Sequence, residues 1–155
     1  MNWHWLAALA WAVALNATAQ VPSPAATWHG YDEAASARAD IERALSEAVA
    51  SGRRALVVFG ANWCGDCRVL DMAMKQGRLK ALVEAKFVVV KVDVARFDKN
   101  VEIAQRFGVP LKLGIPAVAV LAADGSASFV TSGGELANAR SMGEEALLAL
   151  FGRAF

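Results

Sequence analysis

The sequence GANWCGDCRVL (residues 60–70) contains both cysteines of the chain, Cys64 and Cys67, with two residues between them. Cysteines at this spacing occur in three kinds of site: a structural disulfide, half of a metal site, and a redox centre that opens and closes. The two cysteines alone do not decide among these sites, so the surrounding sequence must.

Two continuous apolar runs flank this stretch. ALVVFG (55–60) leads directly into it and FVVVKVDV (87–94) follows it, and such runs are typical of strands buried on both faces. The sequence between them is helical, from Cys64 to about Gln76 and, after an interruption at Gly77, over 78–86. A strand, a helix and a second strand in this order predict two parallel strands joined by a right-handed crossover.

Further elements are predicted on both sides of this unit. Strands are expected over 117–122 and 127–131, joined by a hairpin turn at Asp124-Gly125. Helices are expected over 31–51, 98–107 and 141–151, the last opened by a capping box at Ser141 and Glu144. The order predicts an α/β fold with a four-stranded mixed sheet, helices on both faces and an extra N-terminal helix.

The first residues indicate export. MNWHWLAALAWAVALNATAQ contains no Asp, Glu, Lys or Arg, and its apolar run of about ten residues is followed by Ala17-Thr18-Ala19. These features are typical of a signal peptide, and a buried N-terminal helix is the alternative. We predict a signal peptide over 1–19, a flexible arm over 20–30 and one domain over 31–155, located in the periplasm.

Composition limits the partners of this domain. The chain has 155 residues, 56% of them hydrophobic, and its 16 basic and 15 acidic side chains give a net charge of +1. One domain is expected at this length. The charge gives no electrostatic reason to expect nucleic acid or an anionic membrane surface as a partner.

A metal site has too few ligands in this sequence. Zinc is held by four protein ligands, or by three and a water molecule. Beyond residue 19 the chain offers Cys64, Cys67 and the distant His29, so we expect no metal. A structural disulfide stays open, although so short a loop would stabilise the fold only weakly. A redox pair is favoured because a helix N-terminus stabilises a thiolate at Cys64.

The motif NWCGDC (62–67) after a buried strand, with GIPAVAVL (114–121) about fifty residues later, resembles the thioredoxin superfamily. The resemblance covers roughly residues 50–155. It implies that Cys64 is the exposed attacking cysteine and that Cys67 resolves the mixed disulfide. It also implies that Trp63 forms part of the surface beside them, with Gly65 and Asp66 as the intervening dipeptide. No cofactor is implied beyond the redox-active disulfide.

The same resemblance implies a substrate groove. Pro116 matches a proline that the family holds in the cis form facing the cysteines, and Ile115 would offer backbone groups to an extended substrate peptide. Gly133 matches a glycine-containing loop at the other side of the groove. Residues 110–113 are an insertion relative to thioredoxins, and they either tune the choice of partner or form a neutral loop extension.

Two departures from the thioredoxin pattern affect proton handling and the redox potential. Thioredoxins carry a buried acid six positions before the attacking cysteine, where this chain has Val58. Lys91 matches the family's lysine, and Asp93 is either a substitute acid or a simple strand-end carboxylate. Asp66 places a negative charge beside the sulfurs and should disfavour the thiolate, against the pull of Arg68. We therefore expect a reducing potential of roughly −200 to −270 mV.

The sequence favours an exported thiol–disulfide oxidoreductase that reduces disulfide-containing protein substrates. An oxidising compartment supplies no electrons to such a protein, so a membrane thiol reductase is the expected donor. We expect a monomer. A disulfide oxidase or isomerase and a non-catalytic binding module with this fold are the alternatives.

Overall fold

The computed structural model describes residues 28–154. The predicted signal peptide over 1–19 and most of the predicted arm therefore lie outside the described residues. The last residues of the arm, 28–30, contact the domain that follows them, with Trp28 packed against its core. Within residues 28–154 no helix has the length and apolar character needed to cross a membrane.

The centre of the fold is the predicted four-stranded mixed sheet, with strand order β2-β1-β3-β4. The parallel pairing of β1 and β2 sets Val58 opposite Lys91, and β3 and β4 are antiparallel to their neighbours. Every observed strand lies within one residue of its predicted ends. The bounds are β1 (Arg54–Gly60), β2 (Phe87–Asp93), β3 (Ala117–Leu121) and β4 (Ala127–Val130).

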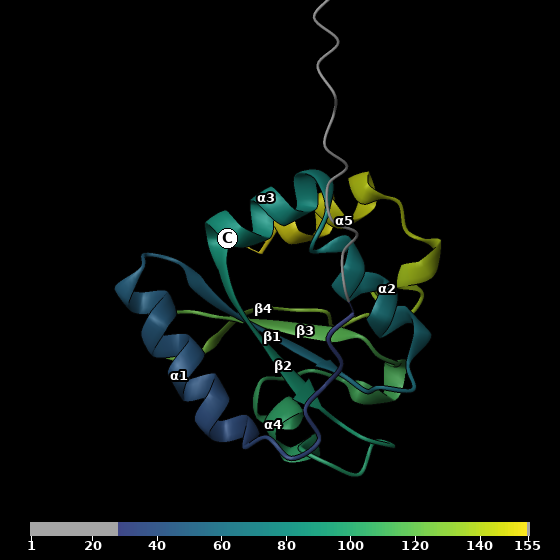
Figure 1. Cartoon of the computed structure of the whole chain (residues 1–155). Coiled ribbons are helices and arrows are strands. Elements are labelled where there is room, and N and C mark those ends of the chain that lie inside the picture. Colours follow the sequence, from purple (N-terminus) through teal and green to yellow (C-terminus); the bar gives the residue numbers. More distant parts are fainter. Residues whose placement is uncertain (1–27, 155) are drawn as a thin grey trace, which may run out of the picture.

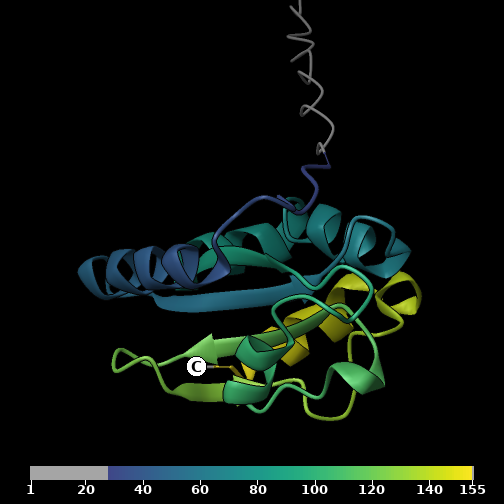
Figure 2. The same cartoon turned by 90° about the horizontal axis from the view of Figure 1, so that it is seen from below.

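Helices cover both faces of this sheet, as predicted (Figure 1). One face packs on α1 and α4, and the other packs on α2, α3 and α5, so each face has its own apolar core. Figure 2 shows the turn between β3 and β4 at the opposite end of the molecule from the short 3-10 helix η1. The bounds are α1 (Ala37–Ala50), α2 (Gly65–Ala73), α3 (Gly77–Lys86), α4 (Val101–Arg106), η1 (Leu111–Leu113), η2 (Ala139–Ser141) and α5 (Glu144–Gly152).

The predicted starts of α1, α4 and α5 are wrong. Helix α1 begins at Ala37 and not at residue 31, because the Asp32 carboxylate accepts the Ala34 N–H and closes a local turn. Helix α4 begins at Val101 and not at residue 98, because Asn100 has a left-handed backbone with φ of 54°. The segments before α1 and α4 lie close to the cysteine pair and serve the site.

The predicted capping box at the start of α5 is also wrong. Ser141 lies in η2, and α5 has no side-chain cap at its N-terminus. The Glu144 carboxylate instead accepts the backbone N–H groups of Arg78 (2.7 Å) and Leu79 (3.3 Å). It therefore caps α3, whose first N–H groups would otherwise lack a partner.

Candidate redox site

The two cysteines form a disulfide at the N-terminus of α2. Cys64 is the N-cap residue of the helix, and its Sγ accepts the backbone N–H of Cys67 at 3.1 Å. The Cα atoms are 5.2 Å apart, and both residues are among the buried residues of the core. When the pair is reduced, the same N–H and the positive end of the helix favour a thiolate at Cys64.

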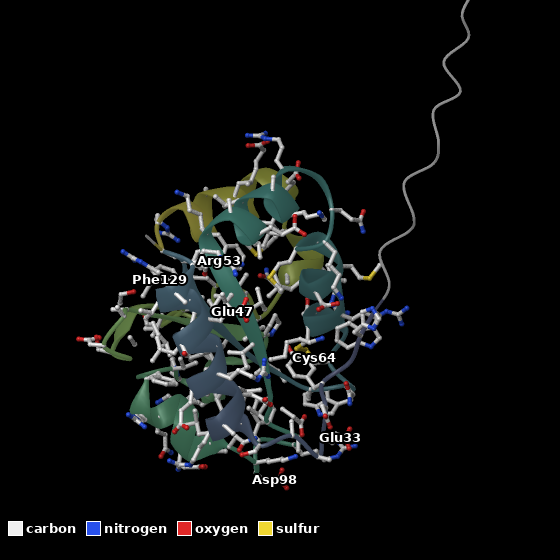
Figure 3. The ribbon with its side chains drawn as sticks, turned by 60° about the vertical axis from the view of Figure 1, so that its left-hand side comes forward. Glu33, Glu47, Arg53, Cys64, Asp98 and Phe129 are labelled. Carbon is white, nitrogen blue, oxygen red and sulfur yellow. A yellow bond between two sulfur atoms is a disulfide. The ribbon has the colours of Figure 1, made fainter. Side chains whose placement is uncertain are left out.

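Cys64 is less accessible than expected. In the disulfide state it is 4% exposed, against 1% for Cys67, so the prediction of an exposed attacking cysteine is wrong for this state. The carbonyl oxygen of Ile115 lies 3.5 Å from its Sγ and covers it. Figure 3 shows Cys64 near the middle of the view, below Arg53 and Glu47 and above Glu33 and Asp98.

Trp63 forms an exposed surface beside the disulfide. Its side chain is 53% exposed, and its Nε1–H donates a 2.7 Å hydrogen bond to the carbonyl oxygen of Ala95. Its ring meets the ring of Phe97 edge to face, with centroids 5.9 Å apart. The loop after β2 therefore holds this tryptophan next to Cys64, as the family resemblance implied.

The loop before β3 faces the pair from the other side. The peptide bond between Ile115 and Pro116 is cis, as expected. Gly133 is exposed and its N–H is already bonded to the Glu135 carboxylate at 3.0 Å. Gly134, with φ of 72°, is the glycine that approaches this loop, because a Cβ there would lie 2.9 Å from the carbonyl oxygen of Leu113. The role of Gly133 in substrate binding stays a prediction.

Asp66 is clamped by an arginine that is 74 positions away in the sequence. The Arg140 guanidinium contacts both carboxylate oxygens, at 2.6 Å from Nη2 and 3.1 Å from Nε, and the Arg140 backbone N–H adds a bond of 2.9 Å. Arg140 comes from η2 and lies over Gly65, where a Cβ would be 3.2 Å from Nη2. This bidentate pair fixes the dipeptide between the cysteines to the C-terminal part of the fold.

The clamp corrects the predicted electrostatics of the dipeptide. Hydrogen bonds from the Arg140 side chain are the main cause that lowers the pKa of Asp66, and burial opposes the shift. The carboxylate is thus ionised, as expected, but it is paired with a cation and does not act as an isolated charge beside the sulfurs. Arg68, the cation that was expected to oppose it, is exposed on the helix surface.

A second ionic cluster joins α2 to β2. Lys91 donates to the buried Asp71 carboxylate at 3.3 Å, which is also paired with Lys75 at 2.6 Å. Lys91 donates to the carbonyl oxygen of His29 as well, and its Nζ lies over the rings of Trp28 (5.1 Å) and Tyr31 (5.5 Å). Burial lowers the pKa of Lys91, and Asp71 opposes that shift.

Tyr31 reaches from the N-terminal segment to Cys67. A Cβ at Gly60 would lie 2.5 Å from Tyr31 Cζ and 2.9 Å from Cys67 Sγ, so only glycine leaves room for both groups. The Tyr31 backbone exchanges two hydrogen bonds with the Asn62 side chain, of 2.6 and 3.0 Å. Burial is the main cause that raises the pKa of Tyr31, helped by the charges of Asp71 and Asp93. The phenol is therefore neutral at physiological pH.

The position of the missing thioredoxin acid is filled by an apolar side chain. Val58 is 2% exposed and belongs to the core on the α3 and α5 face. Asp93 has a local role, because its carboxylate accepts the Ala95 N–H at 3.2 Å and lies 3.4 Å from Lys99. This supports the strand-end interpretation of Asp93, in which the carboxylate shapes the loop that holds Trp63.

Comparison with known proteins is consistent with this geometry. The family model described as thioredoxin-like matches residues 36–123. The chain belongs to this thioredoxin-like family. No curated protein sequence matches the chain. Because this thioredoxin-like chain carries the Cys64–Cys67 pair at the start of α2, it is a thiol–disulfide oxidoreductase.

Two solved structures are similar to the chain. A disulphide isomerase from Xylella fastidiosa Temecula1 is 44% identical, with a TM-score of 0.75, over 79% of this chain and 94% of that chain. The C-terminal domain of DsbD from Neisseria meningitidis, in the oxidised form, is 20% identical, with a TM-score of 0.52, over 76% of this chain and 96% of that chain. The second likeness concerns the fold alone.

Three residues of the site were missed in the sequence. Arg140 and Asp71 look like ordinary surface charges. The i,i+4 spacing links Asp71 to Lys75, but no spacing rule links Asp71 to Lys91 or Arg140 to Asp66. Tyr31 falls within an alanine-rich segment that reads as helix. Nothing in the sequence near Tyr31 indicates a role at the site. Only the fold brings it to Trp28, Lys91 and Cys67.

Proposed function

We propose that this protein reduces disulfides in other proteins of the periplasm through a cycle of its Cys64–Cys67 pair. The supporting observation is the position of Cys64. Its sulfur lies at a helix N-terminus and faces the backbone of Ile115, beside the cis bond to Pro116. A substrate segment paired with Ile115 would bring its disulfide to that sulfur.

The chemistry transfers two electrons in two exchange steps. The Cys64 thiolate attacks one sulfur of the substrate disulfide, and the other substrate sulfur leaves as a thiolate and takes a proton. Cys67, as a thiolate, then attacks the Cys64 sulfur of the mixed disulfide and releases the second substrate thiol. The substrate gains two electrons, and the protein is left in the disulfide form.

A reductive cycle requires a dithiol donor that returns the protein to its reduced form. A membrane thiol reductase suits this role, because the periplasm does not keep thiols reduced by itself. The location depends on the predicted signal peptide, and we expect the protein to act as a monomer. Electrophoresis of the periplasmic fraction, with a thiol-labelling reagent, tests both the location and the redox state of Cys64 and Cys67.

Reduction of insulin in the presence of dithiothreitol tests the activity. We expect the protein to accelerate precipitation of the insulin B chain well above dithiothreitol alone, and Cys64→Ser to abolish the acceleration. Cys67→Ala should trap mixed disulfides with substrates, which mass spectrometry of the exported fraction would identify. A protein no faster than its Cys64→Ser variant would be a binding module with this fold.

Disulfide isomerisation is the second candidate function. It is supported by the 44% identity to a protein described as a disulphide isomerase. An isomerase rearranges substrate disulfides without net electron transfer, so it works without a stoichiometric donor. Reactivation of a test enzyme with scrambled disulfides, with only a catalytic amount of reduced protein present, separates the two functions. Reactivation with slow insulin reduction would favour the isomerase.

A further inference from the structure

An apolar pocket opens next to the redox site. Its volume is about 500 Å³, in the range of ligand pockets. Its walls come from the loop after β2, from α4 and from the segment 109–112, which includes most of the predicted insertion. The apolar residues and the glycine that line it are Phe97, Val101, Val109, Pro110, Leu111 and Gly114.

The pocket shares two walls with the cysteine site. Gly114 lines the pocket and is followed directly by Ile115, whose carbonyl oxygen lies 3.5 Å from Cys64 Sγ. On the other wall, Phe97 contacts the ring of Trp63, the residue before Cys64. A polypeptide held at Ile115 for attack by Cys64 would therefore pass the mouth of the pocket.

Phe97 combines an exposed side chain with a left-handed backbone. Its φ is 66°, a conformation that is unfavourable for a bulky residue. The conformation is held by the bond from the Phe97 N–H to the Val94 carbonyl oxygen, at 2.8 Å. Its aromatic ring is 42% exposed at the rim of an apolar pocket. Unfavourable backbone conformations concentrate at binding sites.

We propose that this pocket receives an apolar side chain of the substrate polypeptide, close in sequence to the cysteine that Cys64 attacks. The inference rests on the proposed function and adds a preference for incompletely folded substrates. Apolar side chains near a cysteine are buried in a folded protein and become available when the chain is extended. Val109 and Leu111 are themselves buried, so they provide a rigid apolar surface for that side chain.

Reduction of small disulfide peptides tests this inference. Synthetic peptides closed by one disulfide would carry a single Leu, or Ser as the reference, at each of the two positions on either side of one cysteine. We expect a kcat/KM about tenfold higher for the Leu peptide at one of these positions, from burial of one apolar side chain. Equal values for Leu and Ser at all positions would overturn the inference.

A variant that fills the pocket makes the test specific. Gln105 lines the pocket from α4 and is exposed, so Gln105→Phe should fill the space without disturbing the core. We expect the ratio of kcat/KM for the Leu peptide to kcat/KM for the Ser peptide, both measured on this variant, to fall below about twofold. The matched control is Ser46→Phe on the exposed face of α1, which should keep the preference.

The remaining outcomes separate the inference from the function. Reduction of both peptides at equal rates would support the proposed function and would contradict a role of the pocket in substrate binding. A wild-type protein that reduces neither peptide contradicts the proposed function and the inference together. If Gln105→Phe keeps the Leu preference but changes the oligomeric state on size-exclusion chromatography, the pocket is a contact between two copies and the inference is wrong.

Discussion

Helix α2 carries two buried carboxylates, Asp66 and Asp71, that pair with different cations in different parts of the fold. Asp66, in its first turn, lies between the cysteines and is paired with the exposed side chain of Arg140. Asp71, one turn after Cys67, is paired with Lys75 and with Lys91 on β2. The first pair lies at the helix end that stabilises a Cys64 thiolate, and the second lies under the N-terminal segment.

The difference separates control of reactivity from control of stability. A change at Asp66 or Arg140 alters the charge near Cys64. A change at Asp71, Lys91 or Tyr31 loosens the contact between α2, β2 and the segment before α1. The two pairs therefore predict variants with distinct phenotypes, although both belong to one short helix.

The largest expected effect is on the N-terminal segment. Tyr31→Ala removes a buried aromatic ring packed near Gly60 and Lys91, and we expect it to lower the free energy of unfolding by about 3–4 kcal/mol. Urea unfolding of the disulfide form measures the loss. The control is Trp28→Ala, which should cost less because Trp28 is only partly buried. A loss below about 1 kcal/mol for Tyr31→Ala would mean that the segment does not stabilise the fold.

The two carboxylates can be compared directly by neutralising each. Asp71→Asn leaves Lys91 without its buried anion. We expect this variant to lower the free energy of unfolding by about 2 kcal/mol. The loss is less than for a fully buried pair because Lys91 is partly in contact with water. Asp66→Asn should cost clearly less, because the partner it releases is exposed. Urea midpoints of both variants decide the point, and equal losses would contradict the separation.

Redox potential should respond to the first pair only. Arg140→Met leaves the Asp66 carboxylate unpaired near Cys64, so we expect the potential to become more negative by about 30 mV. Asp66→Asn frees the Arg140 cation, which should stabilise the Cys64 thiolate and shift the potential by a similar amount in the positive direction. Equilibration with glutathione measures both shifts and also the wild-type value.

The double variant Asp66→Asn with Arg140→Met provides the control for these shifts. Because it removes both charges, its potential should return close to that of the wild type. Asp71→Asn should leave the potential unchanged, which ties the effect to the first pair. Shifts of the same sign in Asp66→Asn and Arg140→Met would show that the clamp acts through structure and not through charge.

The sheet could be predicted from the sequence because its signals are local. The continuous apolar run before Gly60 predicts a strand, and Gly77 predicts a break between two helices. Neither signal depends on residues that are distant in the sequence. The helix starts were less predictable, because residues 31–36 have helical composition but are used for packing. Glu144 shows the same limit, since the partner it caps is on α3 and not on its own helix.

The site could be predicted only as far as its motif extends. The two cysteines, Trp63 and Pro116 were identified because they belong to short motifs with fixed spacing. The Asp66–Arg140 pair could not be foreseen, because it depends on where η2 places a residue 74 positions later. The charge of Asp66 was therefore predicted with the right sign and without its partner.

The smallest expected effect concerns the pH dependence of stability. Because burial raises the pKa of Tyr31, the folded state keeps the phenol proton at a pH at which the unfolded chain, with a pKa near 10, loses it. The unfolded state then binds fewer protons, so stability falls as pH rises above about 10. Tyr31→Phe removes this contribution. Between pH 8 and pH 10.5 we expect the free energy of unfolding of this variant to fall by about 0.8 kcal/mol less than that of the wild type. Lys91 also titrates in this range, but it is present in both proteins and largely cancels in the comparison. Urea unfolding at the two pH values measures the change, and parallel loss of stability in both proteins would show that Tyr31 ionises freely in the folded state.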